Sequence, residues 1–141
     1  MFQRVSRTEL ARNTRRVLNA VRRGRPALIE TYGEPEAALL DIADYSILQA
    51  VMRYYAKLPN IDAEAGLSRA AVQALDTTDA RYALVFAHYL ARSISLSRAA
   101  ELLDMSWLGL RSRCQRLNVP LRVSPDDEDS AANDVANASV W

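Results

Sequence analysis

The sequence predicts an α+β protein, in which a small three-stranded sheet with two helices precedes an all-helical domain and an acidic tail. Residues 1–58 combine a capped helix with apolar runs of strand length, and residues 67–123 show helical periodicity. Residues 124–141 carry five acidic residues and no basic one, a composition typical of a segment that is disordered when free. We expect residues 59–66 to form a linker between two small domains.

The first helix is expected to begin at Arg7 and to end at Gly24. Ser6 is a suitable N-cap, and Glu9 three residues later completes a capping box. Gly24 provides the left-handed stop. At about 100° per residue, an apolar stripe falls on one side of this helix and arginines fall on the other. The stripe contains Leu10, Thr14, Val17, Leu18 and Val21. The opposite side contains Arg12, Arg15, Arg16, Arg22 and Arg23.

The charge of this segment has two interpretations. Residues 1–25 hold eight arginines and one acidic residue, Glu9, and charges of one sign at this density repel unless a polyanion lies opposite. The arginines are not interleaved with acids at i,i+4, which favours nucleic-acid binding. However, Lys57 is the only lysine among the 18 basic residues, which indicates a codon bias, so a merely solvated face is the alternative.

Three strands are expected around this helix. Residues 1–5 have room for a short strand, and the apolar runs Ala27–Tyr32 and Glu36–Ile42 are separated by a Gly-Glu-Pro turn at residues 33–35. The apolar face of such a sheet must pack against another element, and the apolar stripe of the helix can cover it. We therefore expect the arginines on the other side of the helix to be exposed.

A second helix is expected after the strands, with Asp41 as its N-cap and Pro59 beyond its end. Apolar residues recur along it at helical spacing. A sheet of three short strands with two helices buries little apolar surface, and dimerisation is a common remedy at this size. We therefore expect a homodimer.

Residues 2–58 resemble the N-terminal domain of the Phd/YefM antitoxins of bacterial toxin–antitoxin pairs. The matching features are the capped helix after a short strand, the order G-x-P-x-A-x-L from Gly33 to Leu39, and Asp44-Tyr45 at the start of a helix. The resemblance implies a homodimer that represses its own operon by binding operator DNA, and a C-terminal segment that neutralises a toxin. It carries DNA contacts over to Ser6, Arg7, Thr8, Arg12, Asn13, Arg15 and Arg16.

Helical periodicity resumes after the linker, in residues 68–75 and 78–91, and Thr77 is a suitable N-cap for the second segment. That segment is apolar almost all round, so we expect it to be largely buried. His88, the only histidine, lies in it without a second ligand at metal-binding spacing. A packed or half-exposed side chain is therefore expected there, rather than a metal or catalytic site.

Residues 94–119 form a helix-turn-helix pattern. Ser95 and Ser106 are suitable N-caps of its two helices, and Asp104 tolerates the left-handed conformation that the turn needs. The core of this pattern is expected to contain Leu96, Ala100, Leu103, Met105, Leu110 and Leu117.

Three roles are possible for the second helix of the pattern. Arg111, Arg113 and Arg116 provide a second candidate DNA contact in a major groove. Trp107 and Leu108 stand where base-reading residues usually lie, and these apolar side chains suit a toxin-binding surface. Alternatively, the apolar side chains simply complete the core.

Residues 80–122 resemble two families. The motif RAAELL-x-MS, followed by LRSRCQRLNV, is similar to the C-terminal helix-turn-helix of Fis-type regulators. The longer stretch ARYALVFAHYLARSISLSRAAELLDMSW resembles a small family of helical candidate antitoxins, whose genes often neighbour those of PIN-domain ribonuclease toxins. The second resemblance implies a toxin partner of that kind.

Several classes of protein are disfavoured. No apolar run approaches the roughly 18 residues of a membrane span, and no secretory signal is expected, so a cytoplasmic protein is predicted. Cys114 is alone, which argues against an internal disulfide. No phosphate loop, metal cluster or nucleophile triad is present, so we expect no enzyme activity and no cofactor.

The sequence thus favours an antitoxin that binds its cognate toxin directly and represses its own operon. The alternative is a stand-alone DNA-binding regulator with two DNA contacts per chain, and a third reading is a pure protein-interaction module. The acidic tail is a solubilising end, a segment that folds on a partner, or a segment that masks the basic face.

Overall fold

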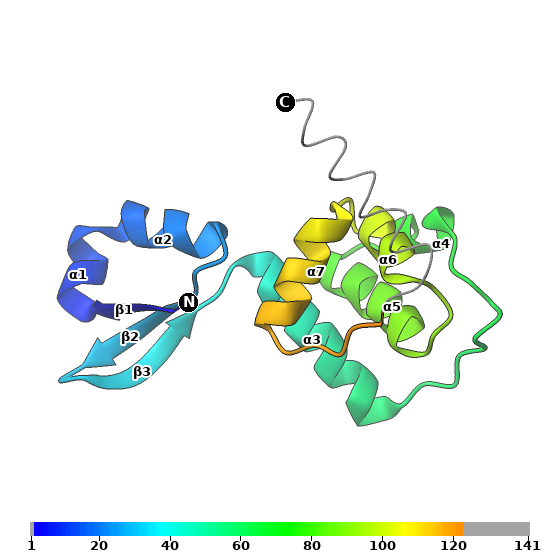
Figure 1. Ribbon diagram of the computed structural model, residues 1–141, viewed down its shortest axis with the longest axis horizontal. Coiled ribbons are helices and arrows are strands. Elements are labelled where there is room, and N and C mark those ends of the chain that lie inside the picture. The colour runs from blue at the N-terminus through cyan, green and yellow to red at the C-terminus, as the bar shows by residue number, and fades with distance from the viewer. Residues whose placement is uncertain (1, 123–141) are drawn as a thin grey trace. The chain divides into compact units, whose positions relative to one another are not determined.

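A computed structural model of the chain describes residues 2–122 (Figure 1). Within that range it contains one three-stranded sheet and seven helices, which confirms the predicted α+β class. The chain divides into two compact units, Met1–Tyr45 and Ser46–Trp141, which are described separately below as the first and second units. The predicted acidic tail, residues 124–141, lies outside the described residues.

The sheet of the first unit has the order β1-β2-β3. Its strands are β1 (Gln3–Ser6), β2 (Ala27–Thr31) and β3 (Glu34–Leu39). Strand β1 is parallel to β2, and β2 is antiparallel to β3. The hairpin turn is shorter than predicted, because Tyr32 (φ 51°) and Gly33 (φ 77°) alone form a two-residue loop with positive φ at both positions. Pro35 therefore lies in edge strand β3, where its missing N–H is tolerated.

The prediction of one continuous first helix is wrong. The segment forms α1 (Arg7–Arg12) and α2 (Thr14–Arg22), which meet at an angle in Figure 1. Asn13 separates them with φ −123° and ψ 38°, outside helical geometry. The Thr14 hydroxyl donates to the Leu10 carbonyl oxygen at 2.6 Å, a side-chain to backbone bond of the kind that bends helices. The predicted N-cap is confirmed, since the Glu9 amide donates to the Ser6 hydroxyl at 3.1 Å.

The core of the first unit is small. Its fully buried residues are Val5, Val17, Val21, Ala27 and Ile29. Leu10 and Leu39 pack against this cluster. The apolar stripe is narrower than predicted, because Thr14 and Leu18 are exposed. The break at Asn13 resets the helical phase, so α2 directs only Val17 and Val21 onto the sheet.

The second unit is a helical bundle. Its helices are α3 (Ile42–Lys57), α4 (Arg69–Gln73), α5 (Thr78–Leu90), α6 (Leu96–Leu102) and α7 (Trp107–Arg116). The first turn of α3 belongs to the first unit. Helix α3 was expected to belong to the first domain, up to residue 58. Instead Ile47 and Ala50 are part of the core of the helical bundle, and the Ser46 hydroxyl donates to Asp79 of α5 at 3.3 Å.

The local signals of the helical unit are confirmed. The predicted N-caps Thr77, Ser95 and Ser106 each accept a hydrogen bond from a backbone amide of the following turn, at 3.1, 3.1 and 2.9 Å. Ser68, which was expected inside a helical segment, instead caps α4 by accepting from the Ala71 amide at 3.2 Å. Asp104 adopts a φ of 55° between α6 and α7, as predicted. Leu96, Ala100 and Leu110 are buried, and Leu103, Met105 and Leu117 pack against them. Among the described residues, no helix combines the length and the apolar character needed to cross a membrane.

Candidate nucleic-acid interface

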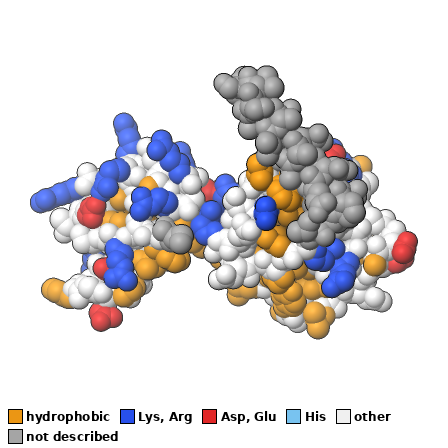
Figure 2. Space-filling view, viewed as in Figure 1, with side chains coloured by type: hydrophobic (Ala, Val, Ile, Leu, Met, Phe, Trp, Pro, Cys, Tyr) orange, Lys and Arg blue, Asp and Glu red, His pale blue; other side chains and the backbone are white. Residues whose placement is uncertain are grey.

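An open hollow of about 580 Å³ lies on the outer side of α1 and α2. We call its charged lining the arginine surface: Arg12, Arg15, Arg16, Arg23 and Arg25. Asn13, Asn19 and Ala20 complete the lining. Figure 2 shows basic side chains gathered over this side of the first unit. Val17 and Val21 pack α2 against the sheet. The arginines on the opposite side of the same helix therefore face solvent.

Most of this charge is not compensated within the described part of the chain. Arg16 pairs with Glu9, whereas Arg12, Arg15, Arg23 and Arg25 have no acidic partner there. Four uncompensated guanidinium groups around one hollow produce a strong positive potential. Such a surface attracts polyanions, and guanidinium groups suit phosphates because they can donate two parallel hydrogen bonds.

Only some of the predicted DNA contacts meet at this hollow. Arg12, Asn13, Arg15 and Arg16 line it. Ser6 and Thr8 do not, and the Ser6 hydroxyl is already engaged as the N-cap of α1.

Arg7 is also separate from the hollow, because it is held by β3. Its Nε donates to a Glu36 carboxylate oxygen at 2.6 Å, and its Nη2 forms an ion pair with the same oxygen. The other Glu36 oxygen accepts from the Thr31 hydroxyl at 2.6 Å. The hydrogen bonds from Thr31 and Arg7 hold the pKa of Glu36 below its usual value, so the carboxylate stays ionised beside Arg7. Arg7 therefore adds little to the unpaired positive charge.

Sequence reasoning missed Asn19 and Arg25 as members of this site, and it placed Arg23 on the arginine side of the helix without naming it as a DNA contact. Asn19 lies four positions after Arg15 on α2, so helical periodicity extended from that arginine would have found it. Arg25 follows α2 and was counted only as a charge. Its position at the hollow depends on how the chain leaves the helix.

The second candidate DNA contact is less exposed. Arg111, Arg113 and Arg116 of α7 are all half-buried, and Arg113 and Arg116 make further contacts. The Arg111 guanidinium lies over the Trp107 ring, 5.2 Å from its centroid. These arginines therefore differ from the arginine surface, where four of the five guanidinium groups have no acidic partner among residues 2–122.

The two candidate toxin contacts have different environments. Trp107 is only 6% exposed and belongs to the core of the helical bundle, whereas Leu108 is 37% exposed. The indole N–H of Trp107 is buried without an acceptor in the described part of the chain. Trp107 thus fills the core role that the sequence left open for it, and Leu108 is the member of the pair that a partner could contact.

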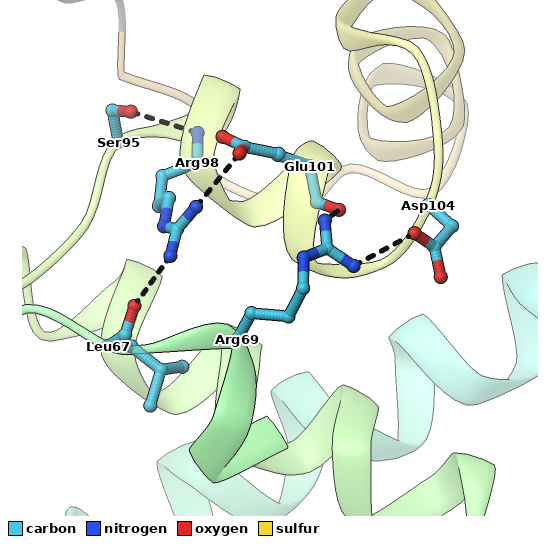
Figure 3. Close-up of polar contacts among 6 residues, drawn as sticks. All are labelled: Leu67, Arg69, Ser95, Arg98, Glu101 and Asp104. Carbon is cyan, nitrogen blue, oxygen red and sulfur yellow. Dashed lines mark hydrogen bonds and ion pairs between the residues drawn. The ribbon is translucent and has the colours of Figure 1, made fainter. Parts of the chain in front are cut away.

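Two arginines connect α6 and the turn after it to the segment that begins α4 (Figure 3). Arg69, at the start of α4, donates to the Asp104 carboxylate at 3.1 Å and to the Glu101 carbonyl oxygen at 2.7 Å. Arg98 donates to the Leu67 carbonyl oxygen at 3.2 Å and lies 3.0 Å from the Glu101 carboxylate. These bonds connect α4 to the helix-turn-helix.

No group of three or more metal-ligating side chains occurs among residues 2–122. The single cysteine, Cys114, is buried. His88 is half-buried, and its Nδ1 lies 3.0 Å from the Ser93 hydroxyl. Burial holds the pKa of His88 below its usual value.

No protein-family model, curated protein or solved structure matches this chain. The resemblances of residues 2–58 and 80–122 therefore stay predictions.

Proposed function

We propose that this protein is an antitoxin-type autorepressor. The first unit binds operator DNA as a homodimer, and the helical unit holds a cognate toxin, for which a PIN-domain ribonuclease is the candidate. The observation that carries the DNA part of the proposal is the set of four unpaired arginines around one hollow on α1 and α2.

DNA binding would use two kinds of contact. Arg12, Arg15, Arg23 and Arg25 would bind backbone phosphates, which fixes the position of the protein on the duplex but carries no sequence information. The amides of Asn13 and Asn19 line the same hollow and offer both donors and acceptors, as base edges require. The arginine surface would supply affinity, and the two asparagines would supply part of the specificity.

The proposal of a homodimer is supported by the small core of the first unit. Strand β3 is an edge strand whose residues are mostly exposed, and Phe2 and Tyr32 are exposed large apolar side chains beside the sheet. Pairing two such units would bury this surface and place two arginine surfaces on one molecule. A two-fold symmetric operator would follow.

The toxin part of the proposal is supported by exposed apolar side chains on the second unit. Met52, Tyr55 and Leu58 are 64%, 52% and 66% exposed on and just after α3, and Leu108 of α7 is also exposed. Met52 and Tyr55 lie three positions apart on α3, and neighbouring exposed apolar side chains are typical of protein–protein contact sites.

The test combines two assays. The full-length tagged chain is co-expressed with the product of its neighbouring gene and purified, and the eluate is then titrated onto the DNA upstream of its own start codon over a salt series. We expect a retained partner and a steep salt dependence. The double variant Arg15→Ala/Arg23→Ala should weaken DNA binding, and its logarithmic salt slope should fall by about 2 per chain, since each lost phosphate contact removes about 0.9.

The matched control is Arg92→Ala, which removes an exposed, unpaired arginine of the second unit. It should leave DNA binding unchanged. An equal effect of both variants, or none of either, would overturn the role of the arginine surface. DNA binding without a retained partner would instead support the stand-alone regulator, although the half-buried arginines of α7 make a second DNA contact there less favourable.

A further inference from the structure

A second, apolar hollow of about 280 Å³ lies between α3 and α5 of the helical unit. We call it the α3–α5 groove. It is lined by Ala50, Arg53, Tyr54, Lys57, Pro59, Ala83, Leu84 and Ala87. The groove exists because the two helices face each other here through alanines, which are too small to fill the space between them. A hollow of this size accommodates one large apolar side chain.

Two cations border this apolar groove. Arg53 and Lys57 lie one helical turn apart on α3, and both are exposed. Neither has an acidic partner among residues 2–122. Two like charges at i,i+4 are mildly unfavourable without an anion. The chemistry that fits the groove is therefore an extended segment with neighbouring carboxylates and a large apolar side chain.

The same chain contains such a segment. Residues 124–141 include the run Asp126-Asp127-Glu128-Asp129, contain no basic residue, and carry an aromatic side chain at Trp141. The negative charges of this segment are complementary to the positive charges that border the groove.

The last described residue, Arg122, lies beside α5. The Arg122 amide donates to the Tyr89 hydroxyl at 2.9 Å, and its guanidinium lies 4.5 Å from the centre of the Tyr89 ring. Tyr89 is two to six residues beyond the groove residues of α5, which corresponds to about 3–9 Å along a helix about 10–12 Å wide. The acidic run begins four residues after Arg122 and ends seven after it, so an extended chain spans roughly 13–25 Å to its members. The carboxylates can therefore reach both cations.

We propose that the α3–α5 groove is the docking site of the acidic segment 124–141, in which carboxylates of residues 126–129 pair with Arg53 and Lys57 and the Trp141 indole occupies the apolar hollow. This inference is independent of DNA and toxin binding. A partner with an acidic and aromatic segment would have to displace the chain's own segment from this groove.

The composition of the chain allows a sharp test. Lys57 is the only lysine, so it carries the only side-chain amine that a carbodiimide can couple directly to a carboxylate. The full-length chain is treated with carbodiimide at low ionic strength, digested, and analysed by mass spectrometry. We expect Lys57 to be joined to a carboxylate of residues 126–129, and the yield to fall several-fold at physiological salt, where the Debye length shortens to about 8 Å.

Two variants make the test specific. Arg53→Glu should reduce the cross-link yield several-fold, because it places a negative charge at the groove, whereas Arg92→Glu makes the same change of charge outside the groove and should leave the yield unchanged. Cross-links within one chain or between two copies both support docking. An unmodified Lys57, cross-links only to acids outside the segment, or equal yields in the two variants would overturn the proposal.

Tryptophan fluorescence provides a second measurement. The contribution of Trp141 is the difference between the full-length chain and its Trp141→Phe variant. We expect acrylamide, a neutral quencher, to quench Trp141 less in the native chain than in Arg53→Glu. Equal quenching in native chain and variant, at the level of free tryptophan amide, would contradict the placement of the indole.

Discussion

Arg69 donates to the carboxylate of Asp104 at 3.1 Å and thereby fastens the start of α4 to the left-handed residue between α6 and α7. The same guanidinium also donates to the Glu101 carbonyl oxygen at 2.7 Å. The two bonds differ in how much they contribute to the stability of the fold. The carboxylate of Asp104 is 81% exposed, so the ion pair is screened by solvent, whereas the carbonyl oxygen belongs to the last turn of a packed helix.

The first prediction follows from that difference. Arg69→Ala should lower the free energy of unfolding by about 1–2 kcal/mol, because it removes a charge-assisted hydrogen bond as well as the ion pair. Asp104→Asn should cost less than about 1 kcal/mol, since Asn keeps the tolerance for positive φ and only the screened ion pair is lost. Urea unfolding of both variants measures the two losses in the free energy of unfolding. A larger loss for Asp104→Asn than for Arg69→Ala would contradict it.

The second prediction compares two arginines of α1 and α2. Arg15→Ala removes an unpaired guanidinium of the arginine surface, whereas Arg7→Ala removes one that already pairs with Glu36. In a salt series on operator DNA, Arg15→Ala should lower the logarithmic slope by about 0.9 per chain, and Arg7→Ala should lower it by less than half as much. If the two variants give the same slope, the pairing of Arg7 does not matter for DNA binding.

The third prediction separates packing from partner binding in α7. Trp107→Ala empties a buried site and should cost about 3–5 kcal/mol of unfolding free energy, whereas Leu108→Ala should change stability by less than about 1 kcal/mol. Loss of a toxin in the first variant would therefore report unfolding. Leu108→Ala is the informative variant in a toxin pull-down, and a stability loss as large as that of Trp107→Ala would show that Leu108 is also part of the core.

The fourth prediction concerns acid stability of the first unit. The pKa of Glu36 is held below its usual 4.5 by the Thr31 hydroxyl and by Arg7. A depressed carboxylate pKa contributes stability at pH values above 4.5, and this contribution is lost as the pH falls through the lower pKa of the folded state. Glu36→Gln should therefore be less stable than the native chain at neutral pH, and the difference should vanish in acid. A difference in unfolding midpoint that stays constant with pH would refute this.

The fifth prediction concerns His88. Burial holds its pKa below the usual 6.5, so the unfolded chain binds a proton more readily than the folded one. Its contribution to stability is complete above pH 6.5 and is lost as the pH falls toward the lower pKa of the folded state. His88→Gln should remove this part of the pH dependence of thermal unfolding. The prediction fails if native chain and variant lose stability in parallel between about pH 7 and pH 5.

The sequence alone determined the local features of this protein. The α+β class, the N-caps Thr77, Ser95 and Ser106, and the left-handed turn at Asp104 were all predicted and are confirmed. Each cap depends on a side chain and a backbone group three positions apart, and the turn depends on the tolerance of one residue. Such interactions are encoded in neighbouring residues, so a pattern in the sequence is enough to find them.

The tertiary structure decided which side chains are available. Arg7 is neutralised by Glu36, 29 positions away in the chain, and no spacing rule connects the two. Trp107 is buried because the rest of the bundle surrounds it, while its neighbour Leu108 stays exposed. The arginine surface likewise acquires Arg25 only through the path of the chain after α2. Burial and ion pairing depend on groups distant in sequence, and therefore only the folded chain shows which charges and apolar side chains remain for a partner.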